Sequence, residues 1–199
     1  MPAVPPASLP PARPDRRDGP VVHLPEPVLV VLVGAAGSGK TTFAARHFAD
    51  AVVVSSDALR ETIAGDVADQ SRNGVVFDAL HRTVDRGLSA GRTVVVDATN
   101  VTAEARRALV ARSSAAGVPA VAIVLDLPLA ACLARNAGRT DRTVPSEAVE
   151  RQHDRLRRDL ARGGLDAEGF AAVHVLAGGR AIGSVRVERG PGRAPGPRG

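Results

Sequence analysis

The amino-acid sequence predicts an α/β fold, a parallel sheet flanked by helices, on the strength of three observations. Between residues 28 and 176, short apolar runs alternate with longer amphipathic segments, as in chains built from βα repeats. The apolar runs are rich in valine and unbroken by charge, which suits strands buried on both faces. A glycine-rich loop follows the first run directly and leads into a helical pattern. With 199 residues, the chain can bury one such core.

Each expected element follows from local pattern. Strands are expected at Val28–Val33, Ala51–Val54, Thr93–Val96, Ala120–Leu125 and, as the last one, Ala172–Leu176. Helices are expected at Lys40–Ala49, Val75–Ala90, Thr102–Ala116, Leu129–Ala137 and Ser146–Ala161. The helix over Val75–Ala90 has apolar residues at every fourth position from Val76 to Leu88. Thr102 and Ser146 are the expected N-caps of their helices.

The two ends of the chain have a different composition. Residues 1–27 contain seven prolines before Val21 and two after it, so we expect a flexible segment without helix or sheet. Residues 189–199 form a Pro/Gly/Arg-rich stretch, which we expect to be a disordered tail. The folded domain is therefore expected over residues 28–188.

The charge pattern is strongly basic. The net charge is +5 and the computed pI is about 11.0, which favours polyanionic partners, although a general preference for arginine codons explains it equally well. Of the 26 basic residues, only Lys40 is a lysine. The sequence has no apolar run of membrane-spanning length, no signal-peptide pattern and one cysteine, so a cytoplasmic location is expected.

The glycine-rich loop carries the clearest chemical signal. Residues 34–41 read GAAGSGKT and match the G-x-x-x-x-G-K-[ST] pattern, in which backbone N–H groups cradle phosphates at a helix N-terminus. The pattern predicts a P-loop NTPase-type site that binds ATP or another NTP with Mg²⁺. Lys40 should reach the β- and γ-phosphates, and the Thr41 hydroxyl should ligate the metal. The expected nucleotide-binding residues of the loop are Gly34, Gly37, Ser38, Gly39, Lys40, Thr41 and Thr42.

Two further strands end in carboxylates. Asp57 follows the second strand and precedes Arg60, so it could accept a proton from an attacking hydroxyl, or it could be a helix N-cap with Arg60 as its surface partner. Asp97 ends the third strand, as in a Walker B motif, and is expected to bind the metal together with Thr41, the alternative being a turn cap. Thr99 and Asn100, which follow Asp97, could contact an acceptor or the turn backbone.

Arginines gather after the fourth strand. Arg135, Arg139 and Arg142 surround Gly138 and could form a lid that stabilises charge on a transferring phosphoryl group. The alternative is a solvated basic helix face, which we expect for the arginines farther along, such as Arg151 and Arg158.

Four segments carry a resemblance to a known family: GAAGSGKTTF, SSDALR, GRTVVVDATN and RNAGRTDR. Together they resemble the 5′-hydroxyl polynucleotide kinase domain of bacterial polynucleotide kinase-phosphatases, which belong to RNA repair, over about residues 28–187. The resemblance implies ATP as phosphate donor and a kinase domain at residues 28–188. It also implies that Asp57 is the general base and that Arg60 binds the acceptor's terminal phosphate. Arg135 and Arg142 would contact the donor phosphates, beside Lys40.

The sequence departs from that family in lacking the G-D-x-H-G run of a following phosphatase. Phosphatase and ligase activities would then reside on other chains or in a longer parent protein. A small-molecule kinase acting on a sugar, nucleoside or antibiotic is the alternative, and a nucleotide-binding module without transfer is a third. With four Phe and no Tyr or Trp, base stacking is expected to be minor.

Overall fold

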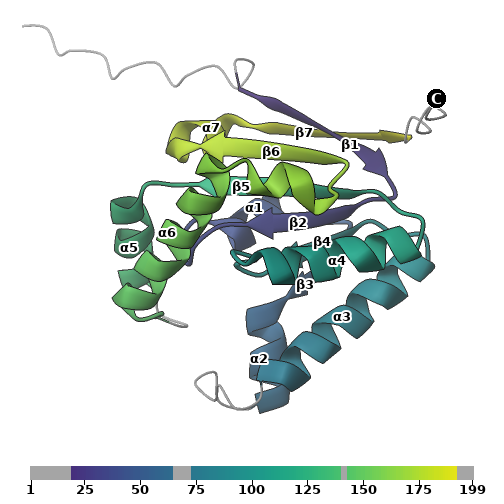
Figure 1. Cartoon of the computed structure of the whole chain (residues 1–199), viewed down its shortest axis with the longest axis horizontal. Helices are drawn as coiled ribbons and strands as arrows, with labels where there is room; N and C mark the ends of the chain where they lie inside the picture. The colour runs from purple at the N-terminus through teal and green to yellow at the C-terminus, as the bar shows by residue number, and fades with distance from the viewer. Residues whose placement is uncertain (1–18, 65–72, 140–142, 192–199) are drawn as a thin grey trace, which may run out of the picture.

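The computed structural model describes residues 19–64, 73–139 and 143–191, and its centre is a parallel sheet of five strands (Figure 1). The strand order is β3-β4-β2-β5-β6, and every neighbouring pair is parallel. These strands are β2 (Leu29–Val33), β3 (Val52–Ser55), β4 (Val94–Asp97), β5 (Ala120–Asp126) and β6 (Ala172–Ala177). The predicted α/β fold is therefore confirmed.

Helices cover both faces of this sheet. They are α1 (Lys40–His47), α2 (Ser56–Ala64), α3 (Asn73–Ser89), α4 (Ala103–Ala115), α5 (Leu129–Ala137), α6 (Ser146–Ala161), the 3₁₀ turn η3 (Gly164–Glu168) and α7 (Gly178–Ser184). Alternate residues of β2 belong to two separate cores. Leu29 and Val31 pack with α3, α4 and α6, whereas Val30 and Leu32 pack with α1 and the segments beyond it. None of these helices is long and apolar enough to cross a bilayer.

The ten elements expected from the sequence are all present, with boundaries within two residues of the expected ones. Local pattern was sufficient for them because the strands are compact apolar runs rich in valine, and the helices are marked by apolar spacing, as in α3, or by capping and stop residues, as in α4. The Thr102 side chain accepts a hydrogen bond from the Ala105 N–H at 3.2 Å, which confirms Thr102 as an N-cap. Ser146 is instead the first residue of α6, and Pro145 occupies the N-cap position.

A second, two-stranded sheet corrects the expectations for both ends of the chain. β1 (Val21–Glu26) pairs in parallel with β7 (Arg186–Pro191) and lies beside the main sheet (Figure 1). The expectation that residues 1–27 lack sheet is thus wrong for β1, and the tail expected from residue 189 begins too early. Ala172–Ala177 is not the last strand either. Val22 and Leu24 alternate into the core, and this burial outweighs the neighbouring prolines.

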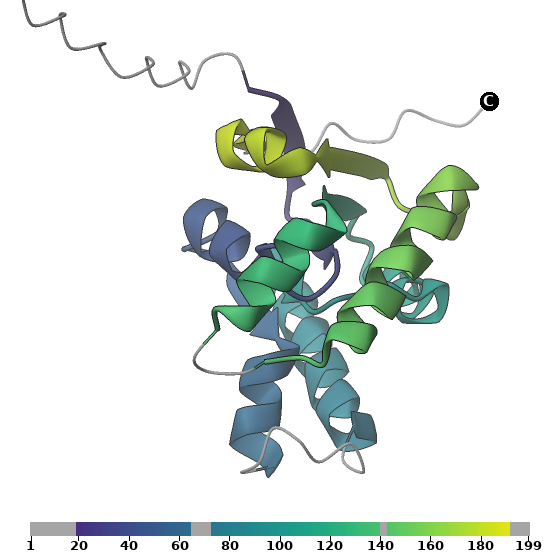
Figure 2. The same cartoon turned by 90° about the vertical axis from the view of Figure 1, so that its left-hand side faces the viewer.

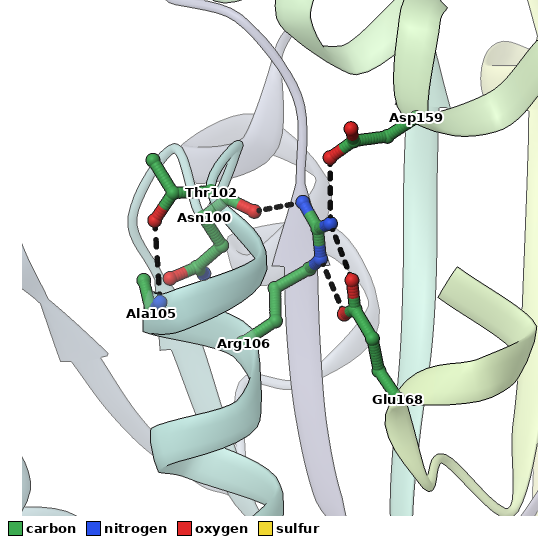
Figure 3. Close-up of polar contacts among 6 residues, drawn as sticks. All are labelled: Asn100, Thr102, Ala105, Arg106, Asp159 and Glu168. Carbon is green, nitrogen blue, oxygen red and sulfur yellow. Dashed lines mark hydrogen bonds and ion pairs between the residues drawn. The ribbon is translucent and has the colours of Figure 1, made fainter. Parts of the chain in front are cut away.

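A buried arginine ties three elements together (Figure 3). The fully buried Arg106 of α4 donates to both carboxylate oxygens of Glu168 at 2.7 Å and to Asp159 of α6 at 2.8 Å. Its third contact is with the Asn100 carbonyl oxygen at 3.0 Å, in the turn that follows β4. The bonds to Glu168 and Asn100 are buried and the bond to Asp159 is partly buried, so Arg106 holds α6 and the β4 turn in one position relative to α4.

The first prediction concerns this buried cluster. Arg106→Leu should reduce the free energy of unfolding by about 3–5 kcal/mol, because the carboxylate of Glu168 would stay buried without its partner. Arg112 on the same helix offers a matched control, since its ion pair with Asp85 is partly exposed. Arg112→Leu should cost about 0–1 kcal/mol. Equilibrium urea denaturation measures both values, and equal losses would contradict the special role of the buried pair.

Candidate functional site

The glycine-rich loop connects β2 to α1 at the carboxyl end of the sheet. Gly37 and Gly39 have φ angles of +79° and +97°, a region that side chains with a Cβ rarely adopt. A Cβ on Gly37 would also lie 2.2 Å from the carbonyl oxygen of Cys132 in α5. Glycine is therefore required at position 37 twice over, by backbone conformation and by the close approach of α5.

Lys40 is folded over this loop. Its Nζ donates to the carbonyl oxygens of Gly34 at 2.8 Å and Ala35 at 2.9 Å, and to the Ser38 hydroxyl at 3.4 Å. The side chain is only 8% exposed. Burial lowers the pKa of Lys40 to about 8, although the nearby carboxylates of Asp97 and Asp57 oppose this shift. The Lys40 ammonium is thus bound to carbonyl oxygens of the loop, from which an incoming anion could draw it away.

Thr41 and Asp97 meet beside Lys40. The Thr41 hydroxyl donates to Asp97 Oδ2 at 2.8 Å, because the parallel register pairs Asp97 with Leu32 near the end of β2. Asp97 is 5% exposed, and its burial raises the pKa of the carboxyl group. A hydroxyl and a carboxylate are hard oxygen ligands, which fits Mg²⁺, an ion that often takes one or two protein oxygens and completes its shell with phosphates and water.

Asp57 and Arg60 lie in the first turns of α2, directly after β3. Arg60 Nη1 donates to Asp57 Oδ1 at 2.9 Å. Asp57 is not the N-cap of this helix, because α2 begins at Ser56 and the Ser55 hydroxyl accepts from the Ala58 N–H at 3.4 Å. The alternative interpretation of Asp57 as a capping residue is therefore wrong, whereas the pairing with Arg60 is present.

One cavity of about 250 Å³ joins these groups. It lies where parallel strands end, the usual ligand position in such sheets. Its walls come from the loop and the start of α1, the end of β4 with the turn after it, helices α2, α3, α4 and α6, and the segment before α6. The lining residues are Ala36, Gly37, Gly39, Lys40, Thr41, Ser56, Asp57, Arg60, Phe77, Asp97, Ala98, Thr99, Asn100, Val101, Thr102, Ala105, Arg139, Val144 and Gln152.

The expected lid arginines lie near the loop, as far as the structure describes them. A Cβ on Gly39 would be 3.4 Å from Arg135 Nη1, and Arg139 lines the cavity. Arg142 lies outside the described residues. Helices α5 and α6, which flank this segment, lie side by side at the carboxyl end of the strands (Figures 1 and 2). Thr42, the last expected loop residue, is exposed in the first turn of α1.

Gln152 of α6 is a cavity residue that was not expected from the sequence. Its Oε1 accepts a hydrogen bond from the Ala36 N–H at 2.9 Å, across 116 residues of chain. This bond connects α6 to the glycine-rich loop. A single glutamine in an arginine-rich helix gives no sequence signal, so only the tertiary structure could identify it.

Asn100 resolves an alternative that the sequence left open. It has a φ of +48°, and its Nδ2 donates to the Leu32 carbonyl oxygen at 2.8 Å, while the Gly34 N–H donates to the Thr99 carbonyl oxygen at 3.0 Å. Asn100 therefore holds the turn backbone against the P-loop. The available sequence signal was an asparagine shortly after a strand, because asparagine is enriched in the left-handed conformation.

Comparisons with known proteins agree with this geometry. A family model described as "AAA domain" matches residues 29–162, about two thirds of the chain. A search of curated proteins found no match. Among solved structures, a chain of the Pnkp1/Rnl/Hen1 RNA repair complex is similar with 24% identity and a TM-score of 0.61, covering 70% of this chain and 47% of that one.

Two further structures are similar in fold. AvrRxo1-ORF1:AvrRxo1-ORF2 solved with ATP has 18% identity and a TM-score of 0.57, covering 71% of this chain and 50% of that one. A putative kinase from Chloroflexus aurantiacus has 16% identity and a TM-score of 0.53, covering 77% of this chain and 88% of that one. At these identities, the similarity shows a shared fold alone. The chain spans about half the length of the first structures it matches.

The second prediction follows from the lowered pKa of Lys40. The ammonium should lose its proton around pH 8 instead of near 10.5, so the affinity for a non-hydrolysable ATP analogue with Mg²⁺ should be constant below about pH 7.5. Above pH 8 the dissociation constant should rise, approaching about tenfold per pH unit. Titration calorimetry or fluorescence anisotropy across pH 6–10 measures this.

Lys40→Arg is the control, because a guanidinium stays charged over this pH range. It should bind the analogue more weakly at every pH, since a planar fork does not replace a compact ammonium, but without the break near pH 8. The same break in both proteins would assign the titration to another group.

Proposed function

The chain belongs to the AAA domain family, and from this premise and the cavity geometry we propose that it is an ATP-dependent polynucleotide 5′-hydroxyl kinase. One observation carries the proposal: a carboxylate–arginine pair, Asp57 with Arg60, lines the same cavity as the P-loop lysine. The carboxylate can accept a proton from an acceptor hydroxyl while the arginine binds an acceptor phosphate. A polynucleotide 5′ end presents both groups within one nucleotide.

The donor side of the proposed site consists of the P-loop and its neighbours. The backbone N–H groups of residues 34–42 would bind the triphosphate, with Lys40 between the β- and γ-phosphates. Mg²⁺ held by Thr41 and Asp97 would neutralise charge on the β- and γ-phosphate oxygens. Arg135, Arg139 and Arg142 would contact the same oxygens from the lid side, and the close approach of Arg135 to Gly39 supports this for one of them.

On the acceptor side, phosphoryl transfer needs one bond to form and one to break. The 5′-oxygen would bond to the γ-phosphorus as the bond from that phosphorus to the β–γ bridging oxygen breaks, which releases the nucleoside diphosphate. The proton of the 5′-hydroxyl would pass to the Asp57 carboxylate. Arg60 would hold the acceptor's first phosphate, so that the hydroxyl faces the donor.

Charge favours a polyanionic acceptor. The net charge of +5 attracts phosphate chains, and the similar chain in an RNA repair complex fits such a role. Phosphatase and ligase activities on other chains or in a longer parent protein would complete an end-repair sequence. A small-molecule kinase is the second candidate, favoured by the small size of the cavity and by the fold of the Chloroflexus aurantiacus putative kinase.

The third prediction tests Asp57 as general base. Asp57→Asn should lower turnover by about 10²–10⁴-fold, the usual contribution of a positioned base, and should leave NTP affinity nearly unchanged because the residue is on the acceptor side. Steady-state transfer assays and nucleotide titration separate the two effects. Normal turnover with weakened NTP binding would instead assign Asp57 to the donor side.

The fourth prediction identifies the acceptor. Radiolabel transfer should be far better to a short 5′-OH oligonucleotide or a nucleoside 3′-monophosphate than to a free nucleoside. The oligonucleotide's KM should rise with salt, by about 0.7 in log units per log unit of salt for each phosphate contact. Arg60→Ala should lower that slope by about one contact. If the free nucleoside serves as well as the oligonucleotide at low and high salt, the small-molecule kinase replaces the polynucleotide kinase.

A further inference from the structure

Phenylalanine is rare in this chain, and one of the four is placed differently from the others. Phe43 and Phe48 are buried in the core beneath α1, and Phe170 packs against the core on the opposite face. Phe77 of α3 is 37% exposed and belongs to none of the core clusters formed by the described residues. The interior of the protein therefore does not explain why position 77 is aromatic.

The position of Phe77 on α3 explains its exposure. The buried stripe of α3 repeats every fourth residue from Val76 to Leu88, and Phe77 is the next residue after Val76, about 100° around the helix. Its side chain is therefore at the flank of the buried face, where α3 borders the cavity.

Exposed single apolar residues are common on protein surfaces and need no function by themselves. The described residues include four large apolar side chains that are exposed: Val53, Val75, Phe77 and Val175. Of these, only Phe77 lines the cavity that contains Lys40, Asp57 and Arg60. The most exposed of them, Val75 at 52%, is two residues earlier on the same helix and does not line that cavity.

The groups around Phe77 match the parts of a single nucleotide. Asp57 can accept a proton from a hydroxyl, Arg60 can bind a phosphate, and an exposed aromatic ring can stack on a flat heterocycle. A sugar or an alkyl alcohol offers the hydroxyl but no planar π-face to this ring. The three groups in one cavity therefore fit a nucleoside phosphate better than a simple alcohol.

We propose that Phe77 is the platform on which the acceptor's 5′-terminal base stacks, which makes it a specificity-determining residue for base-bearing ends. This inference rests on the proposed polynucleotide kinase function and refines it. The scarcity of aromatic residues predicts little base stacking overall. A single aromatic ring is nevertheless sufficient to stack on one base when that ring lines the acceptor cavity. Because every base has a π-face, such stacking would select for the presence of a base rather than for its sequence.

The test uses two 5′-OH oligonucleotides that differ only at the first nucleotide, one with its base and one with an abasic tetrahydrofuran. Wild-type protein should use the base-bearing acceptor with a KM about 5- to 150-fold lower, which corresponds to ~1–3 kcal/mol of stacking. Phe77→Ala should raise the KM of the base-bearing acceptor by the same factor and leave the abasic KM nearly unchanged. Phe77→Tyr should keep the wild-type preference.

Val75→Ala is the matched control, because it removes an exposed apolar side chain of the same helix outside the cavity, and it should change neither KM. ATP affinity and thermal unfolding should be the same for Phe77→Ala and wild type. Equal losses for both acceptors in Phe77→Ala, or no loss for either, would overturn the stacking role while leaving the kinase function intact. Failure of the wild type to phosphorylate either oligonucleotide would overturn the proposed function and this inference with it.

Discussion

The parallel pairing of β2 with β4 is the interaction on which the rest of the site depends. Its register places Asp97 opposite Leu32, so the carboxylate reaches the Thr41 hydroxyl at the start of α1. The pairing continues beyond the strands, because the Gly34 N–H donates to Thr99 and the Asn100 side chain donates to Leu32. One backbone and one side-chain hydrogen bond thus hold the P-loop strand and the turn after Asp97 together, which preorganises the site.

A second layer of contacts fixes the helices around that centre. Arg106 donates to the Asn100 carbonyl oxygen on one side and to Asp159 of α6 on the other (Figure 3). In addition, Gln152 of α6 accepts a hydrogen bond from the Ala36 N–H of the P-loop. Helix α6 is therefore attached to both halves of the site, at points two helical turns apart. These two contacts give α6 a defined position relative to the P-loop and to the turn after β4.

Burial destabilises the charged forms of Lys40 and Asp97 at the centre of the site. It lowers the pKa of Lys40 and raises the pKa of Asp97, so both groups are shifted towards their neutral forms. Each group partly compensates the charge of the other, and among the described residues neither forms an ion pair within salt-bridge distance. A triphosphate beside Lys40 and a cation beside Asp97 would supply both counter-charges at once. The same desolvation that destabilises these charges would then strengthen their contacts with a bound nucleotide.

The sequence by itself determined the features that depend only on residues close together along the chain. The central strands, the main helices and the P-loop with Lys40 and Thr41 follow from short patterns, because valine runs, helical stripes and glycine turns act locally. Only the tertiary structure decided the features that depend on contacts between residues far apart in the sequence. Val22 and Leu24 lie in a strand because β1 pairs with β7 and their side chains pack into the core. Arg106 connects α4 to other elements only through its hydrogen bonds with distant partners such as Glu168 and Asp159. Gln152 and Phe77 reach the site from α6 and α3, and no local pattern encodes such an approach, because it arises from how packed helices are oriented around the sheet.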